Sequence, residues 1–299
     1  MATVASNNND REGHVMKYLA IGILGAALLG ACATPAEQST EATLVEAPAA
    51  EEAVAAPEAE VAEMAVPEAS VIDVATVSAA LASSETRAAE DKERDAGRKP
   101  AEVLAFLGLK PGDTVADFIA SGGWYTEVLS IAVGPDGTVY AQNSEAALAL
   151  RDRAYDKAIT ARLEGGRLAN VVRKDEELTA LTIPAGSVDV AITALNFHDV
   201  YNAYGPEAAV GFLQAIRGTL KPGGVLGLID HVGLPDGPNT DLHRIDPALA
   251  IASAEAAGFE VEAVGDVLAS DTDDHTKNVF DPEVRGQTDR FVLKLKNPA

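Results

Sequence analysis

The sequence predicts an α/β fold built on a mostly parallel β-sheet with helices on both faces. The expected strands are near-continuous apolar runs, as in sheets that are covered on both sides. Two helical segments lead into such strands through similar tight turns, Leu-Lys-Pro-Gly at 109–112 and Leu-Lys-Pro-Gly-Gly at 220–224. A strand at 114–119 also turns through small residues into a helical segment at 124–130. That arrangement is typical of ligand sites in α/β proteins.

The elements follow in order along residues 72–299, which we expect to form one domain. Residues 74–93 are rich in alanine and charge and lack Pro and Gly, which predicts a helix. A second helix follows Lys99, because Pro100 is tolerated in a first helical turn, and these N-terminal helices extend to 108. Further strands are expected at 138–142, 169–173, 188–195, 225–230, 259–264 and 291–296, and further helices at 145–164, 206–219 and 247–257.

The last two expected strands, at 259–264 and 291–296, have no helical pattern between them. Parallel neighbours need a crossover connection that is usually a helix. We therefore expect this pair to be antiparallel, with a long connection, at one end of the sheet.

The N-terminus resembles an export signal. Residues 18–31 form an apolar run after Lys17. The run is shorter than the roughly 20 residues that span a bilayer, but it suits a secretory signal. Residues 29–32, Leu-Gly-Ala-Cys, resemble the lipobox of bacterial lipoproteins, which implies a signal peptide at 1–31, a lipid-anchored Cys32 and a cell-envelope location facing the periplasm. Because residues 1–15 are polar, we expect translation to begin at Met16. The alternative is a buried helix with an incidental cysteine.

Charge and composition limit the possible partners. Residues 33–71 carry nine glutamates and no Lys or Arg, so segment 32–71 is predicted to be a disordered tether. The whole chain has 46 acidic and 23 basic residues and a net charge of −23, which repels phosphates and argues against a nucleic-acid partner. Cys32 is the single cysteine, so the domain has none for disulfides or thiolate metal sites.

Several motifs together resemble the class I S-adenosylmethionine-dependent methyltransferases. They are the loop after Asp117, the segments 181–189 and 196–201 on either side of a strand, and the turn at 220–224. The segments 94–100, 243–246 and 285–289 also resemble a bacterial subgroup of predicted methyltransferases. The resemblance covers about 85–299. It implies a Rossmann-like, seven-stranded sheet with a reversed last strand, S-adenosylmethionine as cofactor, and an unknown methyl acceptor, either a small molecule or an envelope component.

The resemblance also assigns cofactor-binding positions. The loop after the first strand would surround the methionine part, Asn143 would meet the ribose hydroxyls where the family usually has an acid, and Asp175 would approach the adenine. The alternatives are that Ile119 belongs to the core, that Ser121 makes a turn and that Asn143 caps the following helix. The assigned positions are Asp117, Ile119, Ala120, Ser121, Gly122, Gly123, Asn143, Asp175 and Asn196.

Histidines and carboxylates follow two neighbouring strands, as His198-Asp199 and Asp230-His231. Ligands of open α/β sheets bind at the carboxyl ends of strands. A histidine beside a carboxylate is suited to take a proton from a methyl acceptor. We therefore predict His198 with Asp199 as catalytic residues, and His231 as the second choice for the base. The alternative is that these histidines cap loops and bond backbone carbonyls.

A metal site is a further alternative, although no ligand pair has a diagnostic spacing and no metal is assigned. Asp246 before Pro247 is equally a helix N-cap. The sequence therefore favours a methyltransferase. One alternative is an exported, non-catalytic lipoprotein with a degenerate methyltransferase fold that binds another ligand or a metal, and the other is a structural envelope lipoprotein. The candidate metal ligands are His198, His231, His243, His275, Asp199, Asp230, Asp246 and Asp274.

Overall fold

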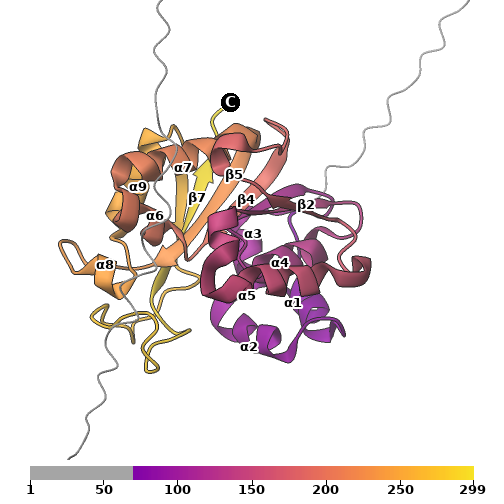
Figure 1. Ribbon diagram of the computed structural model, residues 1–299, viewed down its shortest axis with the longest axis horizontal. Helices are drawn as coiled ribbons and strands as arrows, with labels where there is room; N and C mark the ends of the chain where they lie inside the picture. The colour runs from indigo at the N-terminus through magenta and orange to yellow at the C-terminus, as the bar shows by residue number, and fades with distance from the viewer. Residues whose placement is uncertain (1–69) are drawn as a thin grey trace, which may run out of the picture. The chain divides into compact units, whose positions relative to one another are not determined.

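The computed structural model describes residues 70–299 (Figure 1). The expected signal peptide, Cys32 and nearly all of the tether lie outside the described residues. Across residues 70–299, no helix combines the length and the apolar content that crossing a membrane requires.

A seven-stranded sheet in the order β3-β2-β1-β4-β5-β7-β6 forms the centre of the domain. Six strands run in one direction, and β7 is antiparallel to both of its neighbours, β5 and β6. The predicted fold class and the reversed last strand are therefore confirmed. The strands are β1 (Thr114–Phe118), β2 (Thr138–Asn143), β3 (Val171–Asp175), β4 (Val188–Ala194), β5 (Leu220–His231), β6 (Glu260–Gly265) and β7 (Arg290–Lys296).

Helices cover both faces of the sheet and enclose a core on each side (Figure 1). Side chains alternate along the strands, so that Val115 and Ile192 enter one core and Ala116 and Ala191 enter the other. The first core packs against α1 (Val74–Ser83), α3 (Pro100–Leu107) and α4 (Trp124–Val133), with α2 (Ala89–Arg98) and α5 (Glu145–Leu163) nearby. The second packs against α6 (Phe197–Tyr204), α7 (Pro206–Thr219) and α9 (Pro247–Ala256).

Three local expectations are corrected. The single helix expected at 74–93 is wrong: α1 ends at Ser83 and α2 begins at Ala89. Arg87 turns inward between them, where its guanidinium donates to Leu81 O and pairs with Asp95. The helix α6 and the short α8 (Asn239–Leu242) were not expected. The long helix α5 has the expected bounds, but the backbone of 150–153 leaves the helical region.

Candidate functional site

The loop that follows β1 has an unusual backbone. Ile119, Ser121 and Gly123 have φ angles of 55°, 52° and 80°, in the left-handed region that favours glycine. Counted from Asp117, these are alternate positions of the loop, all three with a positive φ. The loop therefore keeps a glycine-type conformation with isoleucine and serine at two of the three positions. Such strain persists where the surroundings impose it.

Asn143, at the end of β2, imposes part of this conformation. Its side-chain Oδ1 accepts from Ser121 N at 2.7 Å, and its Nδ2 donates to Ser121 O at 3.2 Å. The side chain is fully buried, and its amide is engaged with the loop. The alternative that Asn143 caps α5 is wrong, because Ser144 is the cap and accepts from Ala147 N.

A buried charge cluster holds the other side of the loop. Arg162, on α5, donates from Nε to Gly122 O at 2.9 Å and pairs with Asp91 at 2.7 Å. It also pairs with Glu127, which is 1% exposed and takes a second ion pair from Arg167. Sequence reasoning missed this cluster. The available signal was Glu127, a carboxylate on an otherwise apolar face of the helix expected at 124–130.

The other predicted cofactor positions lie around this loop. Asp117 is buried beneath it and accepts from Thr126 Oγ1 at 2.7 Å, and burial raises the pKa of this carboxyl to about 7. Asn196 donates from Nδ2 to Ile119 O at 3.3 Å. Asp175 lies across from Asn143 on β3 and pairs with Arg173. The structure thus gathers the predicted positions at the carboxyl ends of β1, β2, β3 and β4.

The histidine after β4 and the carboxylate near the end of β5 meet, as expected. His198 Nδ1 lies 2.7 Å from Asp230 Oδ1, and His198 N donates to Asp230 Oδ2 at 2.7 Å. The other ring nitrogen, Nε2, lies 3.2 Å from Asp199 Oδ1. Burial by itself lowers the pKa of His198, but the two flanking carboxylates outweigh burial and raise it to about 10. His198 is therefore an imidazolium at neutral pH, with both ring nitrogens engaged.

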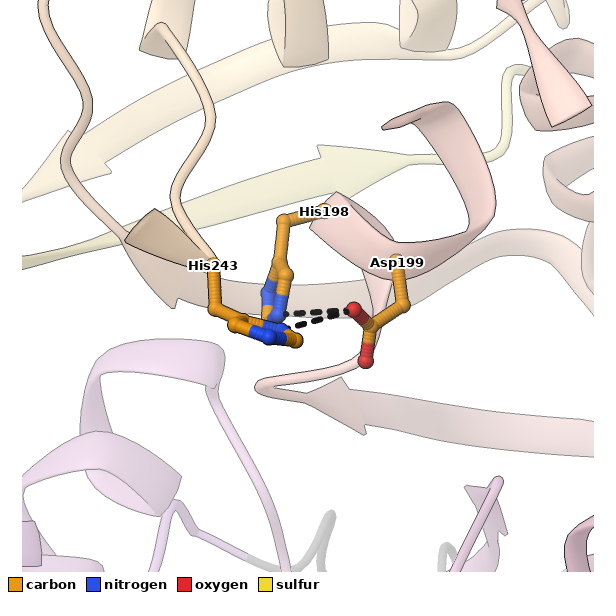
Figure 2. A group of neighbouring side chains, drawn as sticks. All are labelled: His198, Asp199 and His243. Carbon is orange, nitrogen blue, oxygen red and sulfur yellow. Dashed lines mark hydrogen bonds and ion pairs between the residues drawn. The ribbon is translucent and has the colours of Figure 1, made fainter. Parts of the chain in front are cut away.

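His243 joins this group from the segment after α8. Its Nδ1 lies 3.2 Å from Asp199 Oδ1, the same oxygen that faces His198 (Figure 2). One ligand atom from each of His198, Asp199 and His243 falls within 4.8 Å of the others, so these three could hold a metal ion. Asp199 is exposed and its Oδ2 has no partner within residues 70–299.

The remaining candidate metal ligands do not join this group. His231 bonds Thr288 Oγ1 at 2.8 Å, and burial lowers its pKa to about 3, so this ring is neutral. His275 pairs with Asp289, and Asp274 bonds Thr276. Asp246 caps α9 through Ala248 N, as one sequence interpretation predicted. Among residues 70–299 the rings of His198 and His231 bond side chains and no backbone carbonyl, which does not fit the carbonyl bonds that the loop-capping alternative expected.

Comparison with known proteins supports the fold. No protein-family model and no curated protein sequence matches the chain. One similar solved structure is a methyltransferase from Aquifex aeolicus that is described as S-adenosylmethionine-dependent. It is 21% identical in sequence and has a TM-score of 0.50, and the match covers 75% of this chain and 98% of the Aquifex chain. A putative sarcosine dimethylglycine methyltransferase from Galdieria sulphuraria is 14% identical, with a TM-score of 0.51 over 70% and 88%.

A third structure of the same fold has a different activity in its name. The [4+2]-cyclase SpnF is 15% identical, with a TM-score of 0.52 over 78% of this chain and 88% of its own. At such identities the likeness shows the fold, and one fold hosts several chemistries. The function therefore has to be argued from the residues at the carboxyl edge of the sheet.

Proposed function

We propose that this protein is an S-adenosylmethionine-dependent methyltransferase that binds its cofactor at the carboxyl ends of β1 and β2. The observation that carries the proposal is the β1 loop, which holds Ile119 and Ser121 in a left-handed backbone against their intrinsic preference. This conformation lets a loop approach a nucleotide-like ligand closely at the start of a helix, here α4. Two solved structures of the same fold are named as methyltransferases, which supports the same reaction class.

The residues around the loop fit such a cofactor. Residues 119–123 would hold the methionine part, with Asn196 adjacent to them. Asn143 would act on the cofactor through the loop, because its amide already binds both polar backbone groups of Ser121. When bound, the cofactor supplies a methyl group on a sulfonium, and transfer needs mainly alignment of the acceptor with that methyl.

The proton of the acceptor would go to Asp199 in this proposal. The sequence favoured His198 as the base, but its two nitrogens face carboxylates and its pKa is about 10. Asp199 has one oxygen engaged by His198 and His243, and its Oδ2 is open to a hydroxyl or amine donor. Burial raises the pKa of Asp199, but the histidine contacts outweigh burial and lower it, so the carboxylate stays ionised. Positioning of Asp199 is then the role of His198 and Asp230.

Calorimetry with S-adenosylmethionine and S-adenosylhomocysteine on the full chain tests the assignment. We expect binding of both, with a rise in the unfolding temperature. If millimolar ligand gives no heat of binding and no thermal shift, the methyltransferase proposal is refuted. The variant D199N should bind both ligands as wild type does, yet release S-adenosylhomocysteine at least tenfold more slowly with an envelope extract as acceptor source. The control is D136N, an exposed carboxylate in the turn before β2, at the opposite edge of the sheet.

A second function, binding of a divalent cation without catalysis, is favoured by the group in Figure 2. Asp230 bonds His198 Nδ1, so a cation that displaces the proton on Nε2 would find that nitrogen directed toward Asp199 and His243, an arrangement that metal-binding histidines commonly have. Titration with Zn²⁺ and with Mn²⁺ tests it. Micromolar affinity that H243A removes and H275A preserves would support this function, and it would replace the first if S-adenosylmethionine does not bind.

We also propose that the protein is exported and held on the membrane, facing the periplasm, by lipid at Cys32. The support is the apolar run at 18–31 and the lipobox-like residues before Cys32. Mass spectrometry of the mature N-terminal peptide tests this location. An unmodified peptide that continues from before residue 32 would contradict it, as peptides from 1–15 would contradict initiation at Met16.

A further inference from the structure

Five arginines among residues 70–299 have no carboxylate partner, and one of the five, Arg290, is buried; the five are Arg98, Arg151, Arg217, Arg285 and Arg290. Arg98, at the end of α2, and Arg290, at the start of β7, have no carboxylate within 4.0 Å among residues 70–299. Arg290 is 6% exposed. Buried charges are normally paired, because removing them from water is costly. The arginines that do have carboxylate partners are Arg87, Arg94, Arg153, Arg162, Arg167, Arg173 and Arg244.

The backbone brings these two arginines together. Arg290 donates from Nη2 to Gly97 O at 2.7 Å, so its guanidinium lies against the residue that precedes Arg98. The end of α2 can come this close because Gly97 has no side chain: a Cβ there would lie 2.7 Å from Gly286 O. The segments 94–100 and 285–289, which the sequence marked as separate motifs, therefore dock on one another.

Tyr125 completes the group from α4. Arg98 Cζ lies 4.5 Å from the centroid of the Trp124 ring, which contacts the Tyr125 ring edge-on at 4.7 Å. The Tyr125 hydroxyl has no hydrogen-bond partner in the described part of the chain. Burial raises the pKa of this hydroxyl to about 12, so it remains a hydrogen-bond donor. The described side-chain atoms that are both fully buried and without a hydrogen bond belong to other residues than Tyr125 and Arg98. The unbonded donors of Tyr125 and Arg98 are therefore accessible to solvent.

This group lies at the ligand-binding edge of the sheet. In the antiparallel ladder of β7 and β5, the backbone of Arg290 lies opposite that of His231, at the carboxyl end of β5. Arg98 and Tyr125 are also close enough to Asp117, at the end of β1, to interact with it electrostatically. The group therefore has two cations and a hydroxyl donor, and it lies next to the predicted cofactor loop. A planar anion that takes several hydrogen bonds fits these donors.

We propose that Arg98, Arg290 and Tyr125 form a carboxylate-binding site of this enzyme. The proposal rests on the proposed function, because the carboxylate belongs either to the amino-acid part of the cofactor or to the methyl acceptor. The two sources share one chemistry and differ in what the arginines affect. A cofactor carboxylate makes them determinants of cofactor affinity, whereas an acceptor carboxylate makes them determinants of substrate class.

Calorimetry on the full chain with two nucleosides separates these sources. S-Adenosylhomocysteine carries the amino-acid carboxylate, and 5′-methylthioadenosine lacks it. If the cofactor supplies the carboxylate, R98M and Y125F should weaken S-adenosylhomocysteine at least tenfold and leave 5′-methylthioadenosine unchanged. The control is R285Q, because Arg285 is an exposed arginine of the neighbouring segment. R290M is informative where its unfolding temperature matches that of wild type, and Y125F preserves the packing of the ring.

If the acceptor supplies the carboxylate, both nucleosides should bind the variants as they bind wild type. Acetate and benzoate should then raise the unfolding temperature of wild type more than chloride does at equal ionic strength, and R98M should abolish that difference. If R98M and Y125F behave like R285Q both in nucleoside binding and in the acetate and benzoate measurement, the proposed carboxylate site is refuted. If wild type binds neither nucleoside, the methyltransferase proposal fails, while the acetate and benzoate arm still tests the arginines.

Discussion

Replacing Ser121 by glycine should stabilise the protein. With φ at 52°, Ser121 occupies the left-handed region, which costs an L-residue about 1–2 kcal/mol. Glycine removes this cost but adds about 0.4–1 kcal/mol of conformational entropy to the unfolded chain. The hydroxyl contributes little, since its contact with Ile119 O is 3.4 Å, and the backbone bonds to Asn143 remain. The expected net gain is about 0.5–1 kcal/mol.

The matched control is Ser121→Ala, which removes the hydroxyl but keeps the Cβ and therefore the strain. Thermal unfolding of the full chain, followed by circular dichroism, should place S121G above wild type and S121A at or below it. A gain of 1 kcal/mol raises the unfolding temperature of a domain of this size by about 2–4 °C. Urea unfolding at 25 °C gives the same comparison as a free energy. If S121G is no more stable than S121A, the loop is not strained at this position and the reasoning fails.

Three further predictions concern residues around the site. Gly97→Ala should destabilise the folded protein by about 1–3 kcal/mol despite the better helix propensity of alanine, because the new Cβ would lie 2.7 Å from a carbonyl oxygen. The control is Gly211→Ala in α7, where the new Cβ meets open space and should stabilise the protein in the same urea assay. Asn143→Asp should lower the free energy of unfolding by about 1–3 kcal/mol, because a buried carboxylate would face the carbonyl to which Asn143 Nδ2 now donates. Calorimetry should also show weaker binding of S-adenosylhomocysteine. A variant that matches wild type in both measurements would contradict the role of the amide. The folded-state pKa of His198 is about 10, above its usual 6.5, so the stability from its charge is complete below pH 6.5 and is lost as pH rises through 10. Urea unfolding at several pH values should show this loss, and Asp230→Asn should flatten it; an unchanged slope would contradict the pairing.

Local patterns were enough to predict most of the fold. Apolar strand runs and the turns at 109–112 and 220–224 depend on neighbouring residues, and the structure confirms the strands they predicted. The break between α1 and α2 was not predictable in this way. It depends on Arg87 turning inward to Asp95 and to a carbonyl of α1, which is a tertiary contact inside an otherwise helical pattern.

For the candidate site, the sequence was enough to predict which strand ends lie next to each other. Adjacent β4 and β5 bring His198 to Asp230, as the expected strand arrangement required. The state of each side chain was not predictable, because it depends on partners that are distant in sequence. His243 lies 44 residues from Asp199, and Asn143 binds Ser121 from a different strand. The second carboxylate on His198, which changes its expected role, is visible only once the helix α6 has formed.

The position of β7 constrains how the domain is assembled. It lies between β5 and β6, both of which precede it in the chain, and pairs with each along most of its length. During synthesis β6 has no strand to join until residues 290–296 emerge, and one edge of β5 stays open. Arg290 is the first residue of that strand, so the sheet closes and the second guanidinium arrives beside Gly97 in one late step. A chaperone that shields the edge of β5 would thus act on a domain in which the proposed carboxylate site is not yet assembled.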